Sequence, residues 1–125
     1  MAELKHPIRE AERYLQNARQ ILSEKAEKDG DYYNDRKYVK MAGNTAWDAV
    51  LSVQDSMKKG QRPDFRDYQI AIGKKDAKMN RVLVNAYDLL HKSLGYDGVT
   101  DYKVVQASLE QAKIIPDWAE QQYRL

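Results

Sequence analysis

The clearest pattern in the chain is a stripe of small and apolar residues between residues 31 and 57. Its members recur at steps of three and four, the spacing of one face of an α-helix: Val39, Ala42, Gly43, Ala46, Val50, Val53 and Met57. The centre of the stripe holds only alanine and glycine, so a neighbouring helix can approach it closely. We therefore expect a helix in a bundle, with this stripe buried against the preceding helix.

Similar stripes and end signals predict the elements on either side. The first helix is expected from Pro7 to about Lys28, where Asp29-Gly30 ends it, because proline suits a first turn and glycine a helix end. The second is expected from about Asp31 to Lys59. So short a connection makes the two helices antiparallel neighbours.

The second half of the chain predicts three further helices. Asp64 caps a short helix that ends near Gly73, and the next runs from about Asp76 to Leu94. Whether residues 64–94 form one helix or two stays open. Thr100 caps the last helix, which is expected to close at Ile114-Ile115-Pro116 because the residue before a proline disfavours helical geometry. Trp118 then packs back on the bundle.

Together these elements predict an all-α fold, an up-down antiparallel bundle of four main helices plus a short connecting helix. The chain of 125 residues has the size of one domain, so residues 1–125 are expected to form a single unit. No stretch approaches the roughly 18 consecutive apolar residues of a membrane span. The N-terminal segment has no apolar run, so no secretory signal is expected.

Composition narrows the chemistry further. The chain has no cysteine, which excludes disulfides, thiolate metal sites and cysteine nucleophiles and is compatible with the cytoplasm, where we expect the protein. A net charge of +2 provides no global attraction to nucleic acid or to an anionic membrane. Nine tyrosines accompany one phenylalanine. Tyrosine suits half-buried positions with one wet end, so helix interfaces or a groove are its expected places.

Three segments resemble bacterial HEPN-type helical bundles: EAERYLQNARQIL (residues 10–22), DYYNDRKYVKMAGNTAWDAVLSVQD (residues 31–55) and YDLLHKSLGYDG (residues 87–98). The resemblance implies an alanine-rich first helix against a second with a similar run of small residues. Many proteins of that family are ribonucleases that use an arginine and a histidine a few residues apart. Here nine residues separate Arg81 from His91, and no arginine precedes His6. The resemblance therefore points to the non-catalytic or uncharacterised members.

One polar site can be suggested around His91. Asp88 and Tyr87 precede it by three and four positions, so the three side chains can meet on one side of a helix. A carboxylate that orients an imidazole is half of a general acid-base arrangement, but no nucleophile accompanies it. The alternative is a surface pair near a helix end, where a protonated imidazole complements the helix dipole. We expect no catalytic residue.

The acidic segment DGDYYND, residues 29–35, invites a calcium interpretation. Counted from Asp29, an EF-hand loop would need glycine at its sixth position and glutamate at its twelfth, but the chain has Asn34 and Lys40 there. Asp31 or Asp35 is better used as a helix cap. With two histidines and no cysteine, a zinc or iron site would have to rest on carboxylates, so we expect no metal and no cofactor.

A basic window is the more informative charge feature. Between Lys58 and Arg81 the chain carries eight basic and three acidic residues, a net charge of +5. Lys74, Lys78 and Arg81 are expected to share a helix face, and such a cluster can bind phosphates. The alternative is a solvated connector between helices.

From the sequence alone we expect a non-enzymatic bundle that acts through protein–protein interaction, most simply as a homodimer. The tyrosine excess and the small-residue stripe both suit a packed interface. The alternative is a nucleic-acid-associated bundle that uses the basic window between Lys58 and Arg81. No membrane association is expected.

Overall fold

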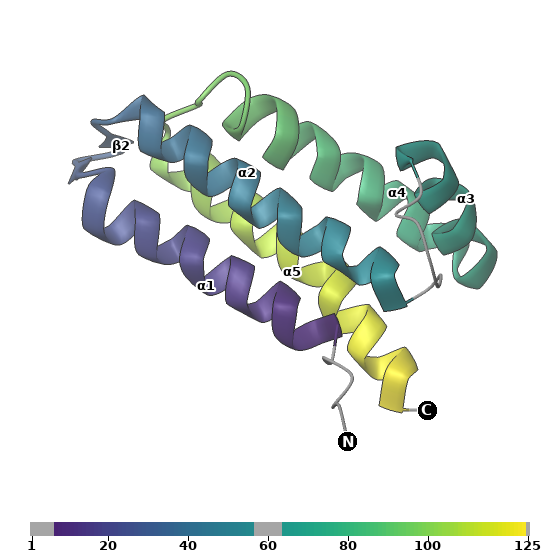
Figure 1. Ribbon diagram of the computed structural model, residues 1–125. Coiled ribbons are helices and arrows are strands. Elements are labelled where there is room, and N and C mark those ends of the chain that lie inside the picture. The colour runs from purple at the N-terminus through teal and green to yellow at the C-terminus, as the bar shows by residue number, and fades with distance from the viewer. Residues whose placement is uncertain (1–6, 57–63, 125) are drawn as a thin grey trace.

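The computed structural model describes residues 7–56 and 64–124, which form an all-α bundle, as the sequence predicts (Figure 1). Five α-helices make up most of it: α1 (Pro7–Lys25), α2 (Arg36–Ser52), α3 (Phe65–Lys75), α4 (Ala77–Ala86) and α5 (Tyr102–Arg124). A 3-10 turn, η1 (Val53–Ser56), extends α2, and a π-helix, η2 (Tyr87–Leu94), extends α4. Two short strands, β1 (Lys28–Asp29) and β2 (Tyr32–Tyr33), form a hairpin.

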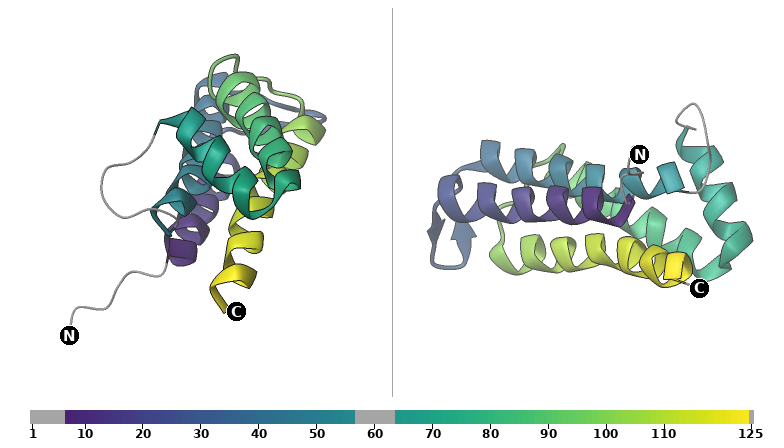
Figure 2. Two further views of the ribbon diagram at one scale, coloured as in Figure 1. Left: turned by 90° about the vertical axis from the view of Figure 1, so that its right-hand side faces the viewer. Right: turned by 60° about the horizontal axis from the view of Figure 1, so that its bottom comes forward.

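The long elements run alternately up and down. α1 leads to the hairpin, α2 returns beside it, α4 with η2 runs back, and α5 returns again (Figure 1). α3 is the short connecting helix, and it lies across the end of the bundle away from the hairpin (Figure 2). Its buried Tyr68 and Ile72 hold it there.

The small-residue stripe lies in the core, with Val39, Ala42, Ala46, Val50 and Val53 fully buried. One part of the expectation is wrong. Gly43 faces η2 rather than α1, because a Cβ atom built on it would lie 2.4 Å from Leu94 Cβ and 2.8 Å from the Gly95 backbone nitrogen. Glycine thus permits a close approach of two helices that are distant in sequence. Met57 lies outside the described residues.

The connection between α1 and α2 differs from the prediction of two helices meeting at Asp29-Gly30. α1 ends at Lys25, and Gly30 (φ 61°) occupies the hairpin turn, where Lys28 pairs with Tyr33. α2 begins only at Arg36, where the carboxylate of Asp35 accepts a hydrogen bond from the Lys37 backbone N–H at 3.1 Å.

A pairing with a distant segment explains this difference. The Tyr33 backbone N–H donates to the Thr100 carbonyl at 2.9 Å, and that of Tyr102 donates to the Asp31 carbonyl at 2.8 Å. These bonds hold the strand of Tyr32 and Tyr33 beside the start of α5. A tertiary contact therefore overrides the local helical preference.

Between residues 64 and 94 the chain forms two helices that meet at Asp76. Asp64 caps α3 as predicted, accepting from the Asp67 N–H at 2.8 Å, although α3 runs to Lys75 rather than Gly73. Asp76 is extended (φ −158°, ψ 109°) and caps α4. Beyond Ala86 the helix widens, and the Gly95 N–H donates to the Leu90 carbonyl five residues earlier.

The last helix departs from its prediction at both ends. Asp101, not Thr100, caps it, since its carboxylate accepts from the Val104 N–H at 3.1 Å. The helix continues through Pro116 to Arg124 instead of closing at the proline. Pro116 has no N–H to donate to the Ala112 carbonyl, but its ring is fully buried, and that burial offsets part of the cost. Trp118 packs against the core as expected.

In the described part of the chain, no helix is both long and apolar enough to cross a membrane.

Candidate functional site

The three basic residues predicted to share a helix face do not share one. Lys74 belongs to α3, while Lys78 and Arg81 belong to α4, because the extended backbone of Asp76 separates the two helices. All three side chains are exposed. Lys74 and Arg66 line an open groove of about 540 Å³ between α3 and α4, whereas Lys78 and Arg81 lie outside it. Lys58, Lys59 and Arg62 of the basic window lie outside the described residues.

The suggested polar site forms only in part. The rings of Tyr87 and His91 lie 5.1 Å apart, but Asp88 is not paired with His91. Asp88 instead lies 4.0 Å from the ammonium of Lys92. A π-helical turn, as in η2, contains more residues than an α-helical turn. His91, three positions after Asp88, is therefore turned away from it.

His91 belongs to an aromatic cluster at the α3 side of the bundle. Trp47 and Phe65 meet edge to face at 5.8 Å, Phe65 stacks on Tyr87 at 4.8 Å, and the His91 ring lies 6.2 Å from Trp47. Packing against these aromatic rings is therefore sufficient to explain the position of the His91 imidazole. In residues 7–56 and 64–124, no three His, Asp or Glu side chains gather where they could hold a metal ion.

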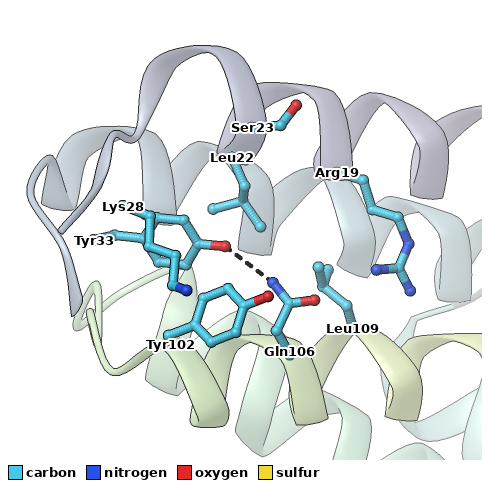
Figure 3. A pocket seen from close by; sticks show the side chains of 8 residues that line it. All are labelled: Arg19, Leu22, Ser23, Lys28, Tyr33, Tyr102, Gln106 and Leu109. Carbon is cyan, nitrogen blue, oxygen red and sulfur yellow. Dashed lines mark hydrogen bonds between the residues drawn. The ribbon is translucent and has the colours of Figure 1, made fainter. Parts of the chain in front are cut away.

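A cavity of about 330 Å³ lies between α1, the hairpin and α5 (Figure 3). Its lining combines cationic, phenolic, amide and aliphatic groups: Arg19, Leu22, Ser23, Lys28, Tyr33, Tyr102, Gln106 and Leu109. This volume is near the lower end of small-molecule pockets, which run from roughly 300 to 1,000 Å³. The lining includes two cationic side chains and no carboxylate.

Tyr33 is the best-fixed polar group of this cavity. Its side chain is 6% exposed, and its hydroxyl oxygen accepts a hydrogen bond from Gln106 Nε2 at 2.9 Å (Figure 3). Burial raises the pKa of the Tyr33 phenol, and the bond from Gln106 opposes that rise. The phenol therefore stays protonated near neutral pH and has a proton to donate.

The two cations hold different positions. The ammonium of Lys28 lies 4.0 Å from the centre of the Tyr102 ring. Arg19 extends from α1 on the other side of the cavity, where its guanidinium lies 3.2 Å from the Glu110 carboxylate. Glu110 thus offsets the charge of Arg19. Of the two cations that line the cavity, Lys28 has no carboxylate partner among the described residues.

Sequence reasoning missed this cavity. Its residues come from three segments that meet only because Tyr33 and Asp31 pair with the start of α5. The excess of tyrosine over phenylalanine was the available signal, since it predicted tyrosines with one wet end in a groove. Nothing in the spacing of Tyr33 and Tyr102 indicated that they would lie together, with ring centres 5.7 Å apart.

A second feature is a group of exposed large side chains on the elements at the hairpin end of the bundle, Tyr32, Tyr96 and Val104. Tyr96 is 79% exposed and Tyr32 56%. Tyr32 pairs through its backbone with Asp101, and Tyr96 lies in the loop between η2 and α5 at the same end (Figure 1). We call this the hairpin-end surface. Tyr32 and Tyr33 point to opposite faces of their strand, so this surface and the cavity are separate.

Comparison with known proteins places the fold. The sequence pattern of a family described as "Domain of unknown function (DUF5618)" matches residues 6–121. A solved structure described as a protein of unknown function from Dyadobacter fermentans is similar, with 39% identity and a TM-score of 0.85. The match covers 94% of this chain and 95% of that one. No curated protein matches the chain.

Proposed function

The chain belongs to the DUF5618 family, and we propose that it is a non-enzymatic helical bundle that acts by protein–protein interaction, most simply by self-association. The observation that carries the proposal is the hairpin-end surface, where Tyr96 is 79% exposed. Tyrosine is enriched at protein interfaces and often dominates their energetics, because it buries a large ring and keeps a polar end.

The charges around this surface favour a second copy of the chain as the partner. The exposed Asp97 follows Tyr96 in the loop after η2. The exposed Arg36, at the start of α2, lies beside Gly98 of that loop. A two-fold interface requires a surface that complements itself, so charges of both signs beside the apolar groups suit it. Asp97 of one copy can then face Arg36 of the other.

Replacing both exposed tyrosines should separate the copies. We expect the wild type to form dimers in sedimentation equilibrium, and Tyr32→Ser with Tyr96→Ser to weaken the association by at least about tenfold, or 1.4 kcal/mol. Both side chains are exposed, so folding should be retained, which circular dichroism checks.

Ile70→Ser is the matched control. Ile70 is 49% exposed but belongs to α3, at the opposite end of the bundle, so its replacement should leave the dimer unchanged. A wild type that stays monomeric up to about 1 mM would refute self-association. A dissociation constant of about 1 mM corresponds to an association free energy of only about −4 kcal/mol. Equal weakening by Ile70→Ser would refute the assignment to the hairpin-end surface.

Kinship with HEPN-type bundles, in a branch without ribonuclease activity, is part of the same proposal. The antiparallel α1 and α2 and the buried Ala42 and Ala46 support it, because the resemblance implied this kind of helix pair. The arginine–histidine motif is absent from the sequence. We also propose a cytoplasmic location, with which the lack of cysteine is compatible.

One observation favours a second candidate function, association with nucleic acid. Arg66 and Lys74 line the open groove between α3 and α4, and Lys78 and Arg81 are exposed nearby on α4. Binding should then be weak and salt-sensitive, because each neutralised phosphate steepens the log–log slope with salt by roughly 0.9. No base-reading element accompanies the groove in the described residues, so sequence preference should be slight.

Titration of labelled single- and double-stranded oligonucleotides at two salt concentrations tests this candidate. Replacing Lys74, Lys78 and Arg81 with glutamine should flatten the salt slope and weaken binding to all sequences about equally. Lack of binding at low salt would leave the basic residues as a solvated connector.

A further inference from the structure

The cavity between α1, the hairpin and α5 contains two tyrosine hydroxyls whose protons have no acceptor among the described residues. Gln106 Nε2 donates to the Tyr33 oxygen at 2.9 Å, so the phenolic proton of Tyr33 is free for another acceptor. The hydroxyl of Tyr102 makes no hydrogen bond to the described residues. Tyr33 comes from the hairpin and Tyr102 from α5, and their hydroxyls, on the same side of the cavity, both point toward Gln106 (Figure 3).

The charge at this point is positive. The ammonium of Lys28 lies against the Tyr102 ring, on the same side of the cavity as the two hydroxyls (Figure 3). No ion pair with a carboxylate neutralises it among the described residues. Three donors, one of them charged, therefore lie at one end of the cavity, an arrangement that suits a carboxylate group.

The cavity also has apolar walls. Leu22 and Leu109 are almost fully buried. Leu22 lies on the α1 side, above the Tyr33 hydroxyl, and Leu109 lies between Gln106 and Arg19 (Figure 3). An inorganic ion has no apolar surface to bury against these leucines. An organic acid with an apolar body does, and burying that surface favours its binding. A volume of about 330 Å³ limits that body to a small molecule.

We propose that this cavity binds a small organic carboxylate with an apolar body. The carboxylate lies against the Lys28 ammonium and the hydroxyls of Tyr33 and Tyr102, and the body lies between Leu22 and Leu109. Arg19, already facing Glu110 at 3.2 Å, closes the far side of the cavity. The site is separate from the hairpin-end surface, so the self-association proposal can fail without affecting it.

Titration of the 125-residue chain with phenylacetate, followed by amide chemical shifts, tests this inference. Phenylacetamide is the neutral probe of the same shape, and inorganic phosphate is the anion without an apolar body. We expect saturable shifts at residues around Tyr33 and Gln106, with phenylacetate at least about tenfold tighter than either comparison probe.

Two variants and one control locate the binding. Lys28→Met removes the charge and keeps the stem, and Tyr33→Phe removes the free proton; each should weaken phenylacetate by at least about tenfold. Lys37→Met is the matched control, because Lys37 also lies over a tyrosine ring, 5.2 Å from that of Tyr38, but outside the cavity. It should leave the affinity unchanged.

Several results would overturn the proposal. Equal affinity for phenylacetate and phenylacetamide would remove the role of the charge. Tighter binding of phosphate would assign the site to an inorganic ion or a phosphate ester. Wild-type affinity in Lys28→Met, or no saturable shift with phenylacetate up to about 100 mM, beyond the weakest range of specific binding, would refute a carboxylate site here.

Discussion

Gly43→Ala should lower the free energy of unfolding by about 2–3 kcal/mol, although a helix-interior glycine-to-alanine change normally stabilises. The added Cβ would lie 2.4 Å from Leu94 Cβ, 2.8 Å from the Gly95 nitrogen and 3.0 Å from the Leu90 carbonyl oxygen. Two of these atoms belong to the backbone of η2 and the turn after it. They cannot rotate away, so α2 and η2 must move apart and lose contacts along their length.

Gly73→Ala is the control for this prediction. Gly73 lies inside α3, and a Cβ atom there would meet only Asn80 Cβ, at an ordinary 3.6 Å. This substitution should leave stability unchanged or raise it by up to about 1 kcal/mol, the intrinsic helix preference of alanine. Urea denaturation of the two variants provides the comparison. Equal midpoints would mean that the α2–η2 contact is looser than the structure indicates.

Tyr68→Ala should cost about 3–5 kcal/mol, the range for removal of a large buried aromatic side chain. Tyr68 is fully buried, and its hydroxyl donates to the Val50 carbonyl oxygen at 2.7 Å. It therefore attaches α3 to the end of α2 through both the ring and the hydroxyl. Tyr68→Phe keeps the ring and should cost only about 1 kcal/mol, the typical net contribution of one hydrogen bond.

Tyr96→Ala provides the comparison with an exposed tyrosine. At 79% exposure its removal should change the free energy of unfolding by no more than about 0.5 kcal/mol. The three variants can be ranked by chemical denaturation at one protein concentration, chosen low enough that the chain is monomeric, because association of the folded chain would add to its apparent stability. If Tyr68→Ala unfolded at the same urea concentration as the wild type, α3 would not depend on this side chain for its attachment.

The helical core could be predicted from the sequence because its signal is local. Spacings of three and four determine which side of a helix is apolar. This spacing alone predicts the burial of four residues that the structure shows in the core: Ala42, Ala46, Val50 and Val53. Caps formed by Asp35 and Asp64 are equally local, since a carboxylate accepts from a backbone N–H two or three residues later.

Features that depend on distant segments could not be predicted in the same way. The partner of Gly43 is η2, about fifty residues further along the chain, and no local pattern distinguishes it from α1. The hairpin and the late start of α2 depend on backbone bonds to residues 100–102. The cavity inherits this dependence, because Tyr33 reaches Gln106 only through that pairing.

The backbone bonds between residues 31–33 and 100–102 also bear on the dynamics of the molecule. They connect the turn after α1 to the first residues of α5, and they close a long loop that contains every element between them. Closing such a loop costs conformational entropy that later contacts must repay. The cavity wall and the attachment of α5 therefore belong to one cooperative unit, and a partial opening that releases α5 also takes Tyr102 and Gln106 away from Tyr33.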